Sequence, residues 1–197
     1  MAARPRVRAA EMTEPLSPFV VFLHGPLGRP SDFDGVLSRL PERFSAFAPL
    51  LPYHRAGAES PRQLAGILEE ELRDEPRPLV FVAGSLGGCV GLEFTRRNRK
   101  RVRGLVLSGC SDDPRDGFGR VDVPVLLLWG TEDVHTPPDV GRRIRAALAD
   151  ARLLFILDAG NLPMVDRPSV FAFHLASFLN DLAPESLPPR RLLDEAA

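Results

Sequence analysis

The stretch "PLVFVAGSLGG", residues 78–88, decides how the rest of this chain is interpreted. It begins with a continuous apolar run, which predicts a strand buried on both faces of a sheet. Small residues, Ser85 and further glycines follow, and residues 85–97 are predicted to form a helix. Ser85 is therefore expected at a sharp turn between a buried strand and a helix.

The same alternation of strand and helix extends to both sides of this turn. Because continuously apolar strands alternate with helices, we expect one α/β domain, residues 18–183, whose mostly parallel sheet of about six strands is flanked by helices. The flanking segments, 1–17 and 184–197, are predicted to be a disordered arm and a disordered tail, and either Met1 or Met12 could be the start of translation. The other expected strands are 19–25, 44–52, 102–110, 123–130 and 152–160, and the other expected helices are 31–40, 60–72, 138–149 and 169–182.

Composition excludes several classes of function. The 197 residues carry a formal net charge of −1, which gives no reason to expect a nucleic acid or an anionic membrane as partner. No apolar run approaches the roughly 18 residues of a membrane span, and the N-terminus lacks the apolar region of a secretory signal. We therefore expect a cytoplasmic protein whose two cysteines, Cys89 and Cys110, are buried thiols.

No cofactor or metal is expected. The chain lacks clustered metal-ligand spacings, and its glycine-containing loops do not match the dinucleotide-binding pattern. The partner expected instead is a small-molecule acyl or carbonyl ligand, and a protein partner stays possible.

Chemistry is expected in three loops beyond the carboxyl ends of the strands, because ligands of parallel α/β sheets bind there. Ser85, in an A-x-S-x-G pattern, is the candidate nucleophile. Asp133, in "LLLWGTEDVHTPP", is the candidate acid that would orient a catalytic base. The loop after His24 and Gly25 is a candidate oxyanion hole, together with the backbone N–H of Leu86.

These stretches resemble the α/β-hydrolase superfamily. "VVFLHGPLG", "LVFVAGSLGG", "VRGLVLSG", "PVLLLWGTED" and "AGNLPMVDRP" stand in the family's order, from about residue 19 to 180. The resemblance is closest to the branch of small esterases, thioesterases and SHCHC synthases. It implies an α/β-hydrolase fold and a Ser–Asp–His triad at Ser85, Asp133 and position 161. Only "SDDPRDGFGRVD" stands where many relatives insert a cap, so no cap domain is expected.

Two positions depart from the family's pattern. Position 161 is Asn161, whose amide neither accepts nor releases a proton near neutral pH. Pro26 stands where the family supplies an oxyanion N–H, and proline has none. These departures favour a degenerate site, in a pseudo-hydrolase or non-standard enzyme that acts on or binds a small acyl or carbonyl compound. The alternative is an active esterase, thioesterase or carbon–carbon lyase in which Ser85 works with His135, or with a base supplied by the substrate.

Overall fold

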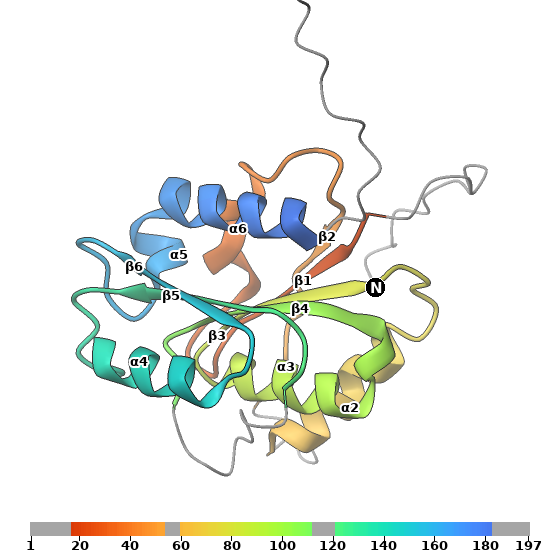
Figure 1. Ribbon diagram of the computed structural model, residues 1–197. Coiled ribbons are helices and arrows are strands. Elements are labelled where there is room, and N and C mark those ends of the chain that lie inside the picture. Colours follow the sequence, from red (N-terminus) through yellow and green to blue (C-terminus); the bar gives the residue numbers. More distant parts are fainter. Residues whose placement is uncertain (1–16, 54–59, 112–120, 183–197) are drawn as a thin grey trace, which may run out of the picture.

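A six-stranded sheet forms the centre of the molecule, and all its strand pairs are parallel. The computed structural model describes residues 17–53, 60–111 and 121–182. The strand order is β2-β1-β3-β4-β5-β6 (Figure 1). The strands are β1 (Phe19–Leu23), β2 (Ala46–Phe47), β3 (Leu79–Gly84), β4 (Val102–Ser108), β5 (Val125–Gly130) and β6 (Ala151–Ile156).

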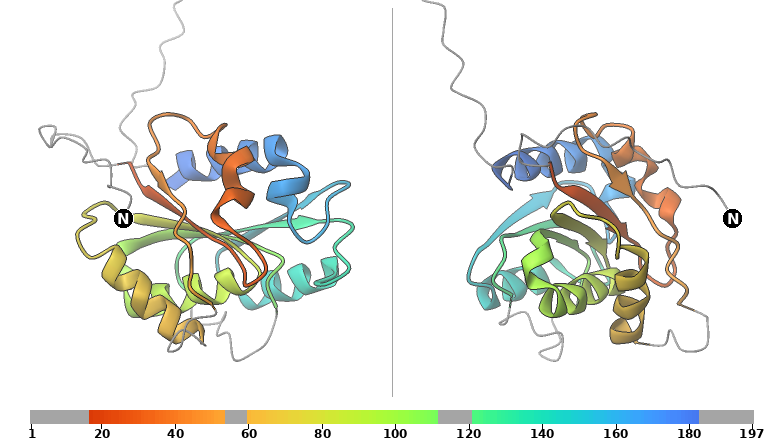
Figure 2. Two further views of the ribbon diagram at one scale, coloured as in Figure 1. Left: turned by 180° about the vertical axis from the view of Figure 1, so that it is seen from behind. Right: turned by 90° about the vertical axis from the view of Figure 1, so that its right-hand side faces the viewer.

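Helices cover both faces of the sheet (Figures 1 and 2). One layer holds α2 (Pro61–Glu71), α3 (Leu86–Arg97) and α4 (Pro138–Ala147); the other holds α1 (Asp34–Leu37), α5 (Pro163–Asp166) and α6 (Pro168–Leu182). Short 3-10 turns η1 (Pro30–Phe33) and η2 (Arg99–Arg101) precede α1 and β4. The alternation along β3 serves both layers, because Phe81 belongs to the core under α2 and α3, whereas Val82 belongs to the core under α6.

The predicted architecture is confirmed: a parallel sheet of six strands is flanked by helices on both faces. The parallel arrangement is complete rather than partial, since every pair in the sheet is parallel. Residues 109–124 connect β4 to β5, and 112–120 among them lie outside the described residues. The predicted arm and tail also lie outside them, except for residue 17.

Two predicted elements differ most from the structure. The helix expected at 31–40 is a 3-10 turn followed by the single helical turn α1, which ends at Leu37. Pro41 restricts Leu40 to extended backbone, so the helix cannot include Leu40. The strand expected at 44–52 is reduced to Ala46–Phe47 at the sheet edge, because Pro49 and Pro52 cannot donate ladder hydrogen bonds. The turn α5 was not predicted.

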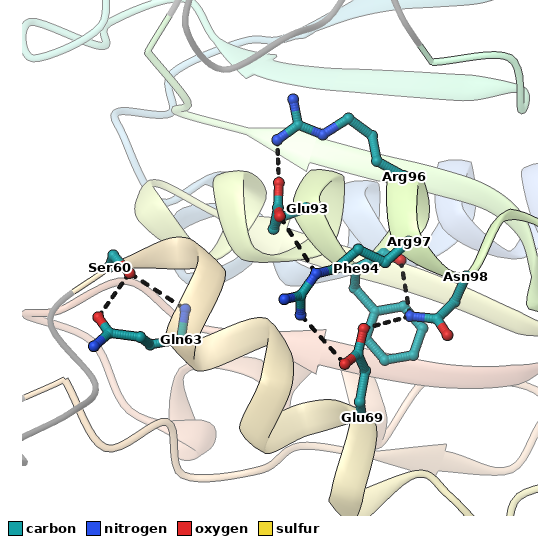
Figure 3. A network of polar contacts seen from close by, with 8 residues as sticks. All are labelled: Ser60, Gln63, Glu69, Glu93, Phe94, Arg96, Arg97 and Asn98. Carbon is teal, nitrogen blue, oxygen red and sulfur yellow. Dashed lines mark hydrogen bonds and ion pairs between the residues drawn. The ribbon is translucent and has the colours of Figure 1, made fainter.

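Polar contacts hold α2 against α3, the helix that follows the serine turn (Figure 3). Ser60 caps α2, where its Oγ accepts a hydrogen bond from the backbone N–H of Gln63 at 3.3 Å. Glu69 of α2 accepts from Arg97 Nη1 at 3.2 Å and from Asn98 Nδ2 at 2.7 Å. These contacts fix the carboxyl end of α3, and so the direction of the whole helix.

Within the described residues, no helix combines the length and apolar character needed to cross a membrane.

Candidate functional site

Ser85 lies in a strained turn between β3 and α3. Its φ of 54° and ψ of −131° fall where side chains other than glycine are rarely found. The turn is held by its neighbours: the Ser85 N–H donates to the Ser108 carbonyl at 2.9 Å. A Cβ on Gly87 would lie 2.4 Å from the Leu23 carbonyl oxygen, so only glycine allows α3 to approach β1 this closely. The A-x-S-x-G pattern thus has a steric cause at Gly87.

The turn leaves two hydrogen-bonding groups available at the start of α3. Leu86 is the first residue of the helix, so its N–H has no acceptor within the helix. Ser85 Oγ forms no hydrogen bond with any residue in the described part of the chain, and it is not among the buried unpaired atoms there. Ser85 is partly exposed. The predicted nucleophile is therefore accessible to solvent, and no base among the described residues is hydrogen-bonded to it.

The buried side chain of His24 supports the predicted oxyanion loop. Its side chain is 4% exposed, and its Nε2 accepts from the Leu51 N–H at 3.0 Å. Its Nδ1 then carries the proton and donates to the Gly25 carbonyl at 2.7 Å. The buried hydroxyl of Tyr53 donates to the His24 carbonyl, and burial raises the pKa of Tyr53. These contacts give His24 a structural role.

The loop after His24 turns back at Pro26. The Gly28 N–H donates to the Gly25 carbonyl at 3.0 Å and closes the turn. A Cβ on Gly25 would lie 2.9 Å from Ser85 Cβ, so the loop passes directly against the serine. Pro26 is thus the residue that follows this contact, and it offers no N–H there.

Asp133 is a buried carboxylate that receives four hydrogen bonds. Its side chain is 3% exposed and lies in the loop between β5 and α4. Oδ1 accepts from the backbone N–H groups of His135 at 2.9 Å and Thr136 at 2.8 Å. Oδ2 accepts from Thr136 Oγ1 at 2.6 Å and from Asn161 Nδ2 at 3.0 Å. These donors are all neutral, and they compensate the carboxylate for its loss of water.

Asn161 meets Asp133 from the loop between β6 and α5. Its Nδ2 donates both to Asp133 Oδ2 and to Thr136 Oγ1, each at 3.0 Å. An ionised carboxylate only accepts, so the nitrogen of the amide, and not its oxygen, must face Asp133. Gly109, with a φ of 57°, leaves room for this side chain: a Cβ there would lie 2.6 Å from Asn161 Nδ2.

The structure brings Asp133 and Asn161 into direct contact and places Ser85 on the neighbouring turn. Ser108 and Gly109 connect the two groups, because the Ser108 carbonyl binds the Ser85 N–H and Gly109 lies against Asn161. The side chain of His135 is exposed, although its backbone N–H belongs to the Asp133 cluster.

Sequence reasoning missed two residues here. Thr136 completes the hydrogen-bonded triangle with Asp133 and Asn161, and the D-x-x-T spacing was a usable signal for it, since an Asp side chain often binds backbone N–H groups two and three residues later. Ser108 is 1% exposed, and its Oγ is one of the buried side-chain atoms without a partner in the described residues. No sequence pattern pointed to it.

A parallel α/β sheet with a strained serine turn after a central strand defines the class of α/β hydrolases. This chain belongs to the alpha/beta hydrolase family, whose sequence pattern matches residues 20–122. That match includes Ser85 and ends before Asp133 and Asn161.

Curated relatives match shorter stretches. The pimeloyl-[acyl-carrier protein] methyl ester esterase of Neisseria meningitidis serogroup A is 32% identical over 73 residues, which cover 37% of this chain and 23% of the relative. The uncharacterized hydrolase YugF of Bacillus subtilis is 33% identical over 60 residues, which cover 30% of this chain and 22% of the relative. The chain thus spans less than a quarter of the length of these two relatives.

Solved structures match nearly the whole fold. MGS-MChE2, an α/β hydrolase enzyme from the metagenome of lagoon sediments at Mar Chica, Morocco, is 25% identical, with a TM-score of 0.76 over 85% of this chain and 93% of that one. A thermophilic esterase from Thermogutta terrifontis has the same TM-score at 16% identity, over 84% of this chain and 90% of that one. The latter likeness concerns the fold alone.

Proposed function

We propose that this protein is an α/β-hydrolase family member that binds a small acyl or carbonyl compound beside Ser85 but does not carry out ordinary ester hydrolysis. The observation that carries the proposal is the contact of Asn161 Nδ2 with Asp133 Oδ2 at 3.0 Å. In both asparagine and histidine, a δ nitrogen is bonded to Cγ, so the amide offers Asp133 the donor that an imidazole Nδ1–H would offer. Asparagine lacks the second ring nitrogen, which accepts the proton of the serine in the family's mechanism.

The chemical consequence is that position 161 offers no acceptor for the Ser85 proton. Acyl transfer requires that Oγ lose its proton as it attacks the carbonyl carbon, and an amide cannot take that proton near neutral pH. Removing the base of a serine hydrolase costs about 10⁶-fold in kcat. Pro26 supports the same conclusion independently, because losing one oxyanion donor costs about 10²–10³-fold.

Labelling with a fluorophosphonate probe tests the proposal. We expect Ser85 to react far more slowly than the serine of an active esterase treated alongside, and Ser85→Ala provides the background level. Stoichiometric labelling of the unmodified protein at the rate of the active esterase would refute the proposal. Hydrolysis of an acyl-ester panel that is lost in both Ser85→Ala and His135→Ala would instead support an active enzyme with His135 as base.

Reconstruction of the base provides the complementary prediction. Asn161→His should gain p-nitrophenyl ester hydrolysis, and Asn161→His combined with Pro26→Phe should gain more. A gain of at least about 10²-fold over the unmodified protein is expected, which is a small part of what a complete base contributes. The matched control is the same pair with Ser85→Ala, which should show no gain. If the folded reconstructed protein stays inactive, the loss of hydrolysis does not rest on these two positions.

A further inference from the structure

The hydrogen-bonding capacity of Asn161 is only half used. A side-chain amide has two N–H donors and one acceptor oxygen with two lone pairs. Both donors are committed, one to Asp133 and one to Thr136. Within the described part of the chain, Oδ1 has no hydrogen-bond partner, and it is not among the buried atoms without one. Asn161 therefore presents an accessible acceptor.

The groups around Ser85 are donors. Ser85 Oγ–H has no partner in the described residues, and the Leu86 N–H begins α3 without a helical acceptor. Ser108, whose carbonyl binds the Ser85 N–H, adds a buried hydroxyl that lacks a partner among the described residues. None of these groups is cationic, and the nearby Asp133 is an acid.

The side chain of asparagine at position 161 is shorter than that of histidine. In asparagine, Oδ1 takes the place of the ring carbon Cδ2 of histidine, and the outer ring atoms have no counterpart. A ligand group that both accepts and donates would pair with Ser85 Oγ and Asn161 Oδ1 together. A primary carboxamide is such a group, with its C=O beside its N–H.

We propose that the site binds a carboxamide, whose carbonyl accepts from Ser85 and Leu86 while its N–H donates to Asn161 Oδ1. The inference rests on the proposed function, since a working triad would place a base in this position. An ester has no N–H for Asn161 and would leave Oδ1 unpaired, which is the kind of mismatch that hydrogen-bonding sites reject. A carboxylate would be repelled by Asp133.

Calorimetric titration with four probes that share a six-carbon acyl chain tests this inference on the intact protein. We expect hexanamide to bind about five- to tenfold more tightly than methyl hexanoate or N,N-dimethylhexanamide, as the loss of one neutral hydrogen bond implies. Hexanoate should bind most weakly. The dimethylated amide keeps the carbonyl and removes both N–H groups, so it tests the contact without altering the protein.

Variants at position 161 locate the preference. Asn161→Leu should bind hexanamide and its dimethylated analogue equally. Asn161→His places the outer ring atoms where the amide is proposed to bind, so it should also lose the preference for hexanamide, and it covers the case in which the leucine variant does not fold. Equal binding of the two amides by the unmodified protein, or failure to bind hexanamide at all, overturns the inference. Rapid turnover of methyl hexanoate during the titration would instead overturn the proposed function, independently of the ranking of the two amides.

Discussion

At the scale of single residues, Asn161 gives Asp133 the donor that the Nδ1–H of a histidine would give, and it has no counterpart of the second ring nitrogen. Its Nδ2 satisfies Asp133, so the buried acid keeps a full set of donors, and the fold does not require a histidine there. The hydrogen bonds that stabilise the buried Asp133 carboxylate therefore do not depend on a histidine at position 161. A site of this kind can lose proton transfer without losing its structure.

Thr136 gives the test of that argument. Thr136→Val removes the hydroxyl that donates to Asp133 Oδ2 and accepts from Asn161, and should lower the free energy of unfolding by about 1–3 kcal/mol. Thr136→Ser keeps the hydroxyl and should cost much less. Urea unfolding at neutral pH measures both. If the valine variant is as stable as the serine variant, the Asp133 cluster does not contribute to stability as described.

At the scale of elements, glycines determine how closely the loops of the site approach the strands. A Cβ on Gly130, at the end of β5, would lie 2.2 Å from the carbonyl oxygens of Ala159 and Gly160, just before Asn161. These are backbone atoms, and a side-chain rotation cannot relieve the clash. The position of Asn161 therefore depends on a glycine in another element.

Two glycine-to-alanine changes with opposite expected signs test this dependence. Gly130→Ala should destabilise the protein by about 1–3 kcal/mol, because the backbone must shift to accept the methyl group. Gly66→Ala, in α2, is the matched control: the nearest atom to its Cβ would be Arg97 Nη1 at 3.8 Å, so the alanine should stabilise the helix by about 0.5–1 kcal/mol. Thermal unfolding of the two variants measures the difference. Equal shifts for both would mean that the close approach at Gly130 carries no cost.

The sequence could predict elements with a local pattern, but not the contacts between distant loops. Strands such as β3 and helices such as α2 followed from local apolar patterns, because those signals lie within the element itself. The bond between Asp133 and Asn161 joins residues 28 positions apart. Its geometry depends on how two loops leave the sheet, and no local pattern encodes that. The family's order of motifs predicted that these residues would be neighbours, but it did not predict Thr136 between them.

At the scale of the whole molecule, the parallel sheet gathers the loops after β1, β3, β5 and β6 at the carboxyl ends of its strands, where the candidate site lies. The amino ends of β3 and β4, on the opposite side, carry charged contacts that are independent of the site. There, Glu75 binds Arg77 Nε at 2.7 Å, and Arg101 Nη2 donates to the carbonyls of Leu72 and Glu75, which tie the end of α2 to the start of β4. Stability and site chemistry can therefore be altered separately.

Glu75 makes the global stability depend on acid. Burial acts to raise the pKa of its carboxyl, but the hydrogen bonds and charge of Arg77 outweigh that effect, so the folded pKa lies below the ordinary value of 4.5. A carboxyl with a lowered folded pKa stabilises the protein fully above its unfolded pKa, and this contribution is lost as pH falls from about 4.5 through the folded pKa.

Glu75→Gln should therefore reduce the free energy of unfolding at pH 7 by about 1 kcal/mol, and the difference from the unmodified protein should vanish in acid. Urea unfolding from pH 7 to pH 3 measures this, with Glu70→Gln, in the exposed pair of Glu70 with Arg73, as a control expected to change little. A Glu75→Gln deficit that persists unchanged at pH 3 would show that the side chain acts through packing and not through its charge.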